Sequence, residues 1–122
     1  MPILNVEIVT QPDEHIRPGL AMELANRTGE IFASPPRSTW VKVYLLAREN
    51  YAENTGTSEL ISPVFVSVLK TKLPSHAVLQ MEVAKLTNVI AQICNRPQEN
   101  IHIIYLPEGT GRVAFGGRLL PD

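Results

Sequence analysis

The second half of this chain of 122 residues repeats the pattern of the first half at an offset of about 60 residues. Each half opens with a strand in which apolar residues alternate with others, as a strand with one buried face requires. A stretch with helical spacing follows, and a second alternating stretch comes after it. The repeat therefore predicts two β-α-β units, with their strands and helices at 3–9, 20–31 and 41–45, and at 64–68, 79–93 and 101–105.

The two predicted units specify how a sheet is assembled. A helix-length crossover joins strands that run parallel, and its handedness is right-handed. If the two opening strands pair antiparallel, the units merge into an α/β (α+β) fold: a four-stranded mixed sheet with both helices on one face. We expect a single domain over residues 1–122, with internal repeats at about 2–58 and 62–117, a polar joint at 50–59 and a small terminal hairpin or edge strand within the glycine-rich tail 108–122.

The other face of this sheet has a mixed character. Its side chains are too polar for a core and in places too apolar to stay in open water, and large apolar patches rarely remain exposed. A contact between subunits would cover the face, so we expect an oligomer. The residues predicted on it are Asn5, Glu7, Trp40, Lys42, Tyr44, Ser67, His102 and Ile104.

Composition excludes several classes of function. A net charge of −1 gives no global attraction to nucleic acid or to an anionic membrane. No apolar stretch approaches the roughly 20 residues of a membrane span, and no signal segment is recognisable, so a cytoplasmic location is expected. Cys94 is the only cysteine, and His15 and His76 have no ligand spacing, so we expect neither a metal nor a cofactor.

Pro2 directly precedes the first strand, and at this position its nitrogen could act as a base or a nucleophile. If Met1 is removed, Pro2 carries a free secondary amine, and α-amino groups titrate near pH 8, about 2 units below lysine. A general base works best when its pKa lies near the working pH. A retained Met1 would instead convert this nitrogen to an amide with no basicity.

The predicted sheet brings cations to Pro2. Antiparallel pairing of the opening strands puts the start of the first beside the end of the second, where Lys70 and Lys72 lie. Pro2 shares its parity with Leu4, so it faces the apolar side, where loss of water disfavours the charged amine, and nearby lysines act in the same direction. The same lysines would attract a substrate carboxylate and stabilise an enolate. The predicted partner is a small anionic molecule.

Several of these features together resemble the tautomerase superfamily. They are Met-Pro at the start of a strand, two β-α-β copies, and Gly116-Gly117 after a short apolar strand. The segment 99–117 is similar to the last strand and C-terminal turn of 4-oxalocrotonate tautomerase. The length and the fused halves are more similar to macrophage migration inhibitory factor and its bacterial relatives, which are trimers. The resemblance implies a homotrimer.

The resemblance also implies an activity and its residues. In the family the N-terminal proline moves a proton between carbon and oxygen of a keto acid, so the implied function is a keto-enol tautomerase acting on a small 2-oxo acid. Lys72 occupies the position at which the family has an arginine shortly after the first strand. The arginine that the family carries within the later strand corresponds to Lys42 in the first copy and to His102 in the second. We assign Pro2, Lys72 and His102, the last from a neighbouring subunit, to catalysis, and we assign Lys70, Lys42, Arg37, Arg112 and Phe115 to substrate binding.

Three alternatives remain open. The same proline chemistry serves hydratases, dehalogenases and decarboxylases of small unsaturated acids, which need a carboxylate to activate water; Glu7, Glu53 and Glu108 are available. A trimeric family member without activity is the second alternative. The third is a ferredoxin-like RNA-binding domain, which has the same order of elements, but the third strand offers only Phe65 for base stacking.

Overall fold

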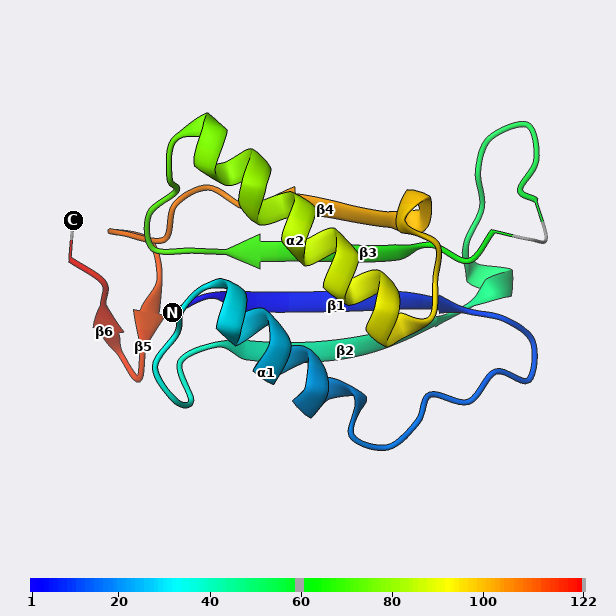
Figure 1. Cartoon of the computed structure of the whole chain (residues 1–122), viewed down its shortest axis with the longest axis horizontal. Helices are drawn as coiled ribbons and strands as arrows, with labels where there is room; N and C mark the ends of the chain where they lie inside the picture. Colours follow the sequence, from blue (N-terminus) through cyan, green and yellow to red (C-terminus); the bar gives the residue numbers. More distant parts are fainter. Residues whose placement is uncertain (59–60, 122) are drawn as a thin grey trace.

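The centre of the fold is a four-stranded mixed sheet, in a computed structural model that describes residues 1–58 and 61–121. The four strands lie in the order β2-β1-β3-β4 (Figure 1). β1 pairs parallel with β2 and antiparallel with β3, and β3 pairs parallel with β4. The predicted merging of two β-α-β units is confirmed, with β1 at Ile3–Thr10, β2 at Trp40–Ala47, β3 at Val64–Leu69 and β4 at Ile101–Tyr105.

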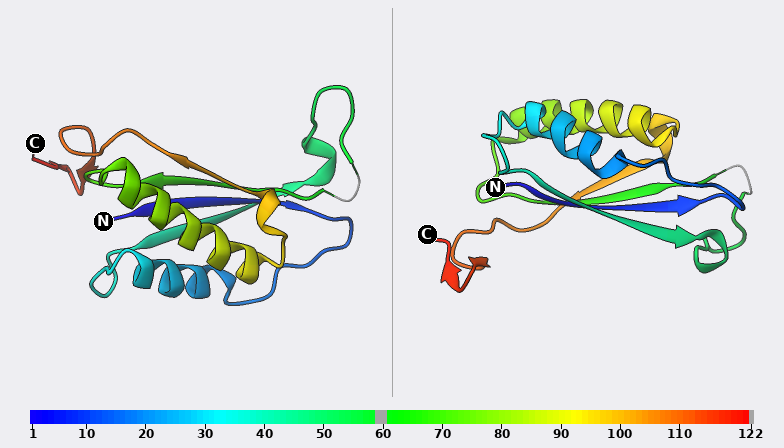
Figure 2. Two further views of the ribbon diagram at one scale, coloured as in Figure 1. Left: turned by 45° about the horizontal axis from the view of Figure 1, so that its top comes forward. Right: turned by 90° about the horizontal axis from the view of Figure 1, so that it is seen from below.

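Two helices cover one face of this sheet, as predicted (Figure 2, right). Helix α1 spans Leu20–Ile31 and begins after Gly19, whose φ of 85° is a conformation that glycine adopts without a steric penalty. Helix α2 spans His76–Cys94, and the Ser75 hydroxyl accepts a hydrogen bond from the backbone N–H of Val78 at its start. Short 3₁₀ turns at Arg48–Asn50 (η1) and Gln98–Asn100 (η2) follow β2 and precede β4.

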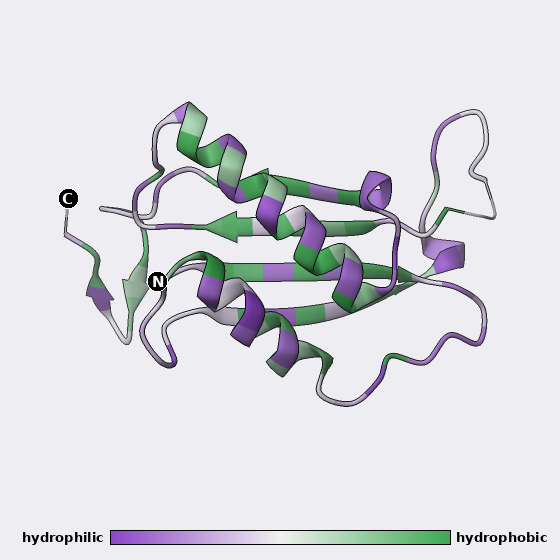
Figure 3. Ribbon diagram, in the orientation of Figure 1, coloured by the Kyte–Doolittle hydropathy of each residue, from purple (hydrophilic) through white to green (hydrophobic). Residues whose placement is uncertain are grey.

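The core lies between the helices and the inner face of the sheet. Alternate residues of β1 and β3 point inward, and on β1 this gives the alternating green and purple bands of Figure 3. They pack against apolar residues at helical spacing on α1 and α2. The fully buried members of this set are Leu4, Val6, Ile8, Leu24, Val64, Val68, Leu86 and Ile90.

No helix covers the outer face of the sheet within the described residues (Figure 2, right). Large side chains remain open to solvent there: Tyr44 is 49% exposed and Ile104 is 60% exposed. The sequence alternation predicts both the position and the mixed character of this face. We call it the open face, made up of Asn5, Glu7, Trp40, Lys42, Tyr44, Phe65, Ser67, His102 and Ile104.

The C-terminal tail forms the small hairpin that the sequence predicts. Strands β5 (Ala114–Phe115) and β6 (Arg118–Leu119) pair antiparallel, and Gly116 and Gly117 turn between them with positive φ. The hairpin lies on the side of the sheet away from the helices (Figure 2, right). The predicted polar joint at 50–59 is seen only to residue 58, since residue 59 lies outside the described residues.

Candidate functional site

Pro2 is held at the beginning of β1 and is buried. Its carbonyl oxygen accepts a hydrogen bond of 3.0 Å from the backbone N–H of Trp40, which ties the starts of β1 and β2 together. The ring shares its inward parity with Leu4, as predicted. Pro2 is therefore anchored in a buried position at the strand end, a setting in which a free amine would lose part of its hydration.

A pocket of about 210 Å³ opens beside Pro2. Three parts of the chain supply its walls: the start of β1, the loop between α1 and β2, and the segment after β3. They meet because Ile3 pairs with Leu69, which places the residues after β3 beside the N-terminus. The predicted neighbourhood of Pro2 with both lysines is found here, since the lining residues are Met1, Pro2, Phe32, Ala33, Ser34, Pro35, Lys70, Thr71 and Lys72.

The two lysines of this proline pocket differ in their partners. The Lys70 ammonium lies 2.7 Å from Oε1 of Glu82, and the Lys70 side chain is only 18% exposed. It also lies 5.2 Å from the centre of the Phe32 ring, a cation–π distance. Lys72 is exposed and has no ion pair within residues 1–58 and 61–121. Lys72 is thus the lysine whose charge is available to an anionic ligand.

Glu82 belongs to a small network that the sequence did not predict. The Tyr105 hydroxyl donates a hydrogen bond of 2.7 Å to Oε2 of Glu82, so both oxygens of this carboxylate have partners. Burial, assisted by the hydrogen bond to Glu82, raises the pKa of Tyr105 far above its ordinary value, which keeps the hydroxyl protonated as a donor. The network joins α2 to the end of β4 and to Lys70.

Lys42 and His102 lie on the open face, away from the proline pocket. Both are exposed, and the His102 ring lies 5.5 Å from the Phe65 ring on the neighbouring strand. Their parity is opposite to that of Pro2, so the structure does not bring them to Pro2 within one chain. Only a second copy of the chain could supply them to this pocket, which is the arrangement predicted for His102.

The remaining predicted binding residues lie outside the pocket. Arg37 lines an adjoining groove that shares Ser34 and Pro35 with the pocket. The Arg112 guanidinium donates to backbone carbonyls of its own turn. The Phe115 ring packs edge to face on Trp40, with 5.3 Å between centres. The structure therefore groups Pro2, Lys70 and Lys72 but not these three residues.

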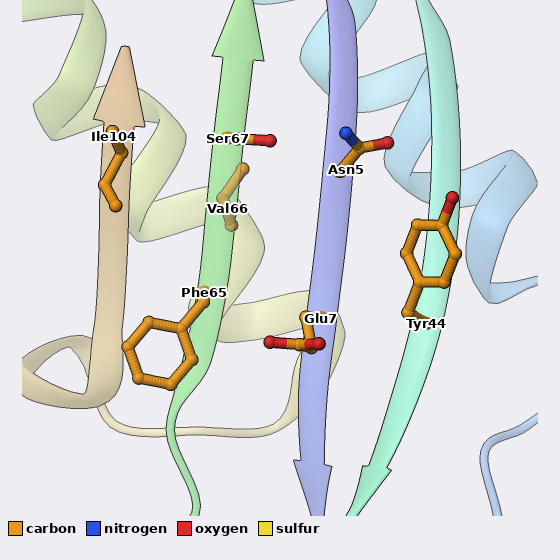
Figure 4. A pocket seen from close by; sticks show the side chains of 7 residues that line it. All are labelled: Asn5, Glu7, Tyr44, Phe65, Val66, Ser67 and Ile104. Atoms are coloured by element: carbon orange, nitrogen blue, oxygen red, sulfur yellow. The ribbon is translucent and has the colours of Figure 1, made fainter. Parts of the chain in front are cut away.

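A hollow of about 410 Å³ lies on the open face. Figure 4 shows Asn5 and Glu7 of β1 flanked by Tyr44 of β2 and Phe65 of β3. The side-chain carbonyl oxygen of Asn5 is buried and has no hydrogen-bond partner among the described residues. This hollow contains no nucleophilic amine, and it lies across the sheet from Pro2.

Two further findings concern absences in the described part of the chain. Residues 1–58 and 61–121 contain no cluster of three or more histidine, cysteine, aspartate or glutamate side chains arranged to hold a metal ion. None of their helices has the length and apolar character needed to cross a membrane.

Comparison with known proteins identifies similar structures but no similar sequence. No protein-family model and no curated protein matches the chain. A fused 4-OT protein solved as a symmetric trimer superposes with a TM-score of 0.77 at 12% identity, over 97% of this chain and 94% of that one. Pt0534 inactivated by 2-oxo-3-pentynoate superposes with a TM-score of 0.76 at 10% identity, over 97% of this chain and 94% of that one. A macrophage migration inhibitory factor homologue from Prochlorococcus marinus superposes with a TM-score of 0.73 at 15% identity, over 97% of this chain and 98% of that one.

Proposed function

We propose that this chain, which has the fold of the tautomerase superfamily, is a keto-enol tautomerase. It would act on a small 2-oxo carboxylic acid with Pro2 as general base. The observation that supports it is the burial of Pro2 in a pocket lined by Lys70 and Lys72. The proposal requires removal of Met1, because an acylated proline nitrogen cannot accept a proton. Because the sequence identity to the similar structures is low, we infer the activity from this pocket rather than from the fold.

The pocket provides the two groups that the reaction needs. Loss of water and the nearby positive charge of Lys72 lower the pKa of an amine, and a depression of about 1 unit from the ordinary α-amino value leaves at least about half of the amine neutral at pH 7. The neutral amine of Pro2 removes a proton from the carbon next to the ketone, and the C–H electron pair forms the enolate. The proton then returns to the enolate oxygen, so no group is oxidised or reduced. Lys72 holds the substrate carboxylate.

We propose that the working form is a homotrimer. The open face carries large exposed side chains, including Tyr44 and Ile104, that a second copy would cover. The fused 4-OT structure is a trimer, which supports this assembly. Across such an interface Lys42 and His102 would approach the pocket of a neighbouring copy and position the 2-oxo carbonyl of the substrate, which leaves Lys72 as the partner of its carboxylate.

The geometry supports tautomerisation over the related hydratase, dehalogenase and decarboxylase reactions. Those need a free carboxylate to activate water near Pro2. Within one chain, Glu7 lies on the open face, across the sheet from Pro2, and Glu108 accepts a hydrogen bond of 2.6 Å from the backbone N–H of Leu73. Glu53 accepts a hydrogen bond from the Tyr51 hydroxyl. A family member without activity remains the alternative that a retained Met1 would produce.

A spectrophotometric assay tests the proposal. The processed chain is given the enol of phenylpyruvate, and ketonisation is followed as loss of enol absorbance. Parallel reactions contain 3-haloacrylates, with halide release as readout. We expect ketonisation above the buffer rate and no halide release. Halide release without ketonisation would assign the pocket to a dehalogenase, and no reaction with either compound would contradict the proposed activity.

A further inference from the structure

We infer that Glu82 determines substrate charge: it neutralises Lys70 and thereby makes the proline pocket select 2-oxo acids with one carboxylate over those with two. The inference rests on the proposed function, because it assumes that 2-oxo acids bind beside Pro2. It concerns a residue that does not itself line the pocket. Glu82 acts through Lys70 and is a positioning residue.

The ion pair is well shielded. The Lys70 and Glu82 side chains are 18% and 11% exposed, and their charged atoms are 2.7 Å apart. At this degree of burial, separation of the pair would leave a carboxylate without its counter-ion, which is strongly unfavourable. Lys70 is therefore not free to turn toward a ligand at little cost.

Two further contacts fix the pair in place. Tyr105 donates to the second oxygen of Glu82, which holds the carboxylate in one orientation. Phe32, which lines the pocket, lies 5.2 Å from the Lys70 ammonium. Each oxygen atom of the Glu82 carboxylate has a partner, so the network stabilises the ion pair with Lys70 when a ligand enters the pocket.

The charge at the pocket follows from these contacts. The charged side chains that line it are Lys70 and Lys72, and Lys70 is compensated. In the part of the chain that the structure describes, this leaves Lys72 as the one uncompensated cation in the pocket wall. One cation can pair with one carboxylate, whereas a second carboxylate would give up its hydration without gaining a counter-ion.

A pair of matched ligands measures this selectivity without any need for turnover. 2-Oxopentanoate and 2-oxoglutarate share a five-carbon 2-oxo acid chain, and only the latter has a second carboxylate. Dissociation constants are measured by NMR titration of the processed full-length protein, with the backbone amides of Thr71 and Lys72 as reporters. We expect 2-oxopentanoate to bind more tightly to the wild type. Tighter binding of 2-oxoglutarate would overturn the inference.

The variant Glu82→Gln removes the compensating charge with little change in shape. We expect it to tighten 2-oxoglutarate binding about tenfold, because Lys70 gains a free charge for the second carboxylate, and to change 2-oxopentanoate binding much less. The exposed Glu99→Gln is the matched control for loss of a carboxylate and should leave the ratio of the two constants unchanged. An unchanged ratio in Glu82→Gln would overturn the inference.

A double variant separates charge from structural damage. Lys70→Met combined with Glu82→Gln restores the net charge of the wild type, so the ratio should return to the wild-type value. A ratio that stays shifted would mean that Glu82 acts through packing, which also overturns the inference. Because these measurements are of binding, they remain informative if phenylpyruvate is not turned over, and that result would count against the proposed function alone.

Discussion

At the scale of single residues, the parity of β1 decides what Pro2 can do. Residues 2 and 4 point to the helix side of the sheet, while Asn5 and Glu7 point to the open face. A shift of one residue in the strand would turn the proline ring to the opposite side, because side chains alternate with a period of two. The register with β3 then brings Lys70 and Lys72 to the same side.

Substitution of Pro2 tests this residue directly. Pro2→Ala still permits removal of Met1 and leaves a primary amine, but it loses the ring that fixes φ and holds the nitrogen in position. We expect kcat/KM for phenylpyruvate to fall about 10²-fold, the size of effect that misplacement of a reacting group by about 1 Å produces. Sedimentation should show an unchanged oligomer. Unchanged turnover would show that the reaction does not require the proline ring and would contradict the role assigned to Pro2.

Lys72 carries the charge that we assign to substrate binding. Lys72→Ala should raise the KM for phenylpyruvate about five- to tenfold with a smaller effect on kcat, because a charge-assisted contact to the carboxylate is lost. Lys85→Ala, an exposed lysine on α2, is the matched control and should leave KM unchanged. Equal effects of the two substitutions would show that only overall charge matters.

At the scale of elements, Arg96 fastens the end of the sheet opposite Pro2. Its side chain is 7% exposed and donates to the backbone carbonyls of Val9, Ser62 and Cys94. Both of its terminal nitrogens also donate to the carboxylate of Glu14, at 2.8 and 2.9 Å. One side chain therefore joins β1, the approach to β3, the end of α2 and the loop before α1, so the four elements are held together there.

This ion pair predicts a pH-dependent stability. The Arg96 hydrogen bond, partly opposed by burial, holds the pKa of Glu14 below its ordinary value of 4.5. Because the pKa of Glu14 is lower in the folded protein than in the unfolded chain, the ion pair stabilises the fold fully above about pH 4.5. This stabilisation is lost as the pH falls through the pKa of Glu14 in the folded protein. In urea unfolding at pH 7, Glu14→Gln should lower the free energy of unfolding by about 1–3 kcal/mol, and this difference should shrink below pH 4.5.

An exposed ion pair offers the control for that experiment. Arg17 pairs with Glu23, but their side chains are 51% and 35% exposed. Glu23→Gln should change the free energy of unfolding by less than about 1 kcal/mol, since exposed pairs contribute little. If Glu14→Gln had an equally small effect, or if its effect persisted at low pH, the assigned role of the Arg96 contact would be wrong.

Most of the fold at the level of elements could be predicted from the sequence, whereas part of the site could not. Alternation and helical spacing predicted the strands and both helices, and the merging of the two repeated units suggested the antiparallel pairing that brings Pro2 to Lys70. The contact of Lys70 with Glu82 and Tyr105 was missed, because it depends on how α2 lies over the end of the sheet. Periodicity indicates which side of a helix is buried but not which polar atoms meet across two elements.

At the scale of the whole molecule, the helices that the structure describes cover the sheet on one side only. The helices bury its inner face, while the open face exposes large side chains around a hollow of about 410 Å³. A surface of this kind is typical of an interface. In the proposed trimer the site would be composite: Pro2 and Lys72 from one copy, and His102 from another.

A single charge on the open face should disrupt the assembly. Ile104→Lys places an ammonium at a position that is 60% exposed in the single chain and buried in the proposed trimer. We expect sedimentation velocity to show smaller species for this variant than for the wild type. Turnover should also be lost, because the composite site requires residues of a neighbouring copy. Met22→Lys, on the outer side of α1, is the control and should leave the mass unchanged. A wild type that sediments as a monomer would contradict the trimer.

The most direct test concerns the proline nitrogen itself. The natively expressed protein is treated with 2-oxo-3-pentynoate, the compound that inactivates the structurally similar Pt0534, and its N-terminal peptide is analysed by mass spectrometry. Addition of a free amine to the alkyne has no leaving group, so we predict a peptide that begins at Pro2 and is heavier by one intact reagent. A peptide that still begins with Met1, or a label on Lys70 or Lys72 with Pro2 unmodified, would contradict the assignment of Pro2 as the base.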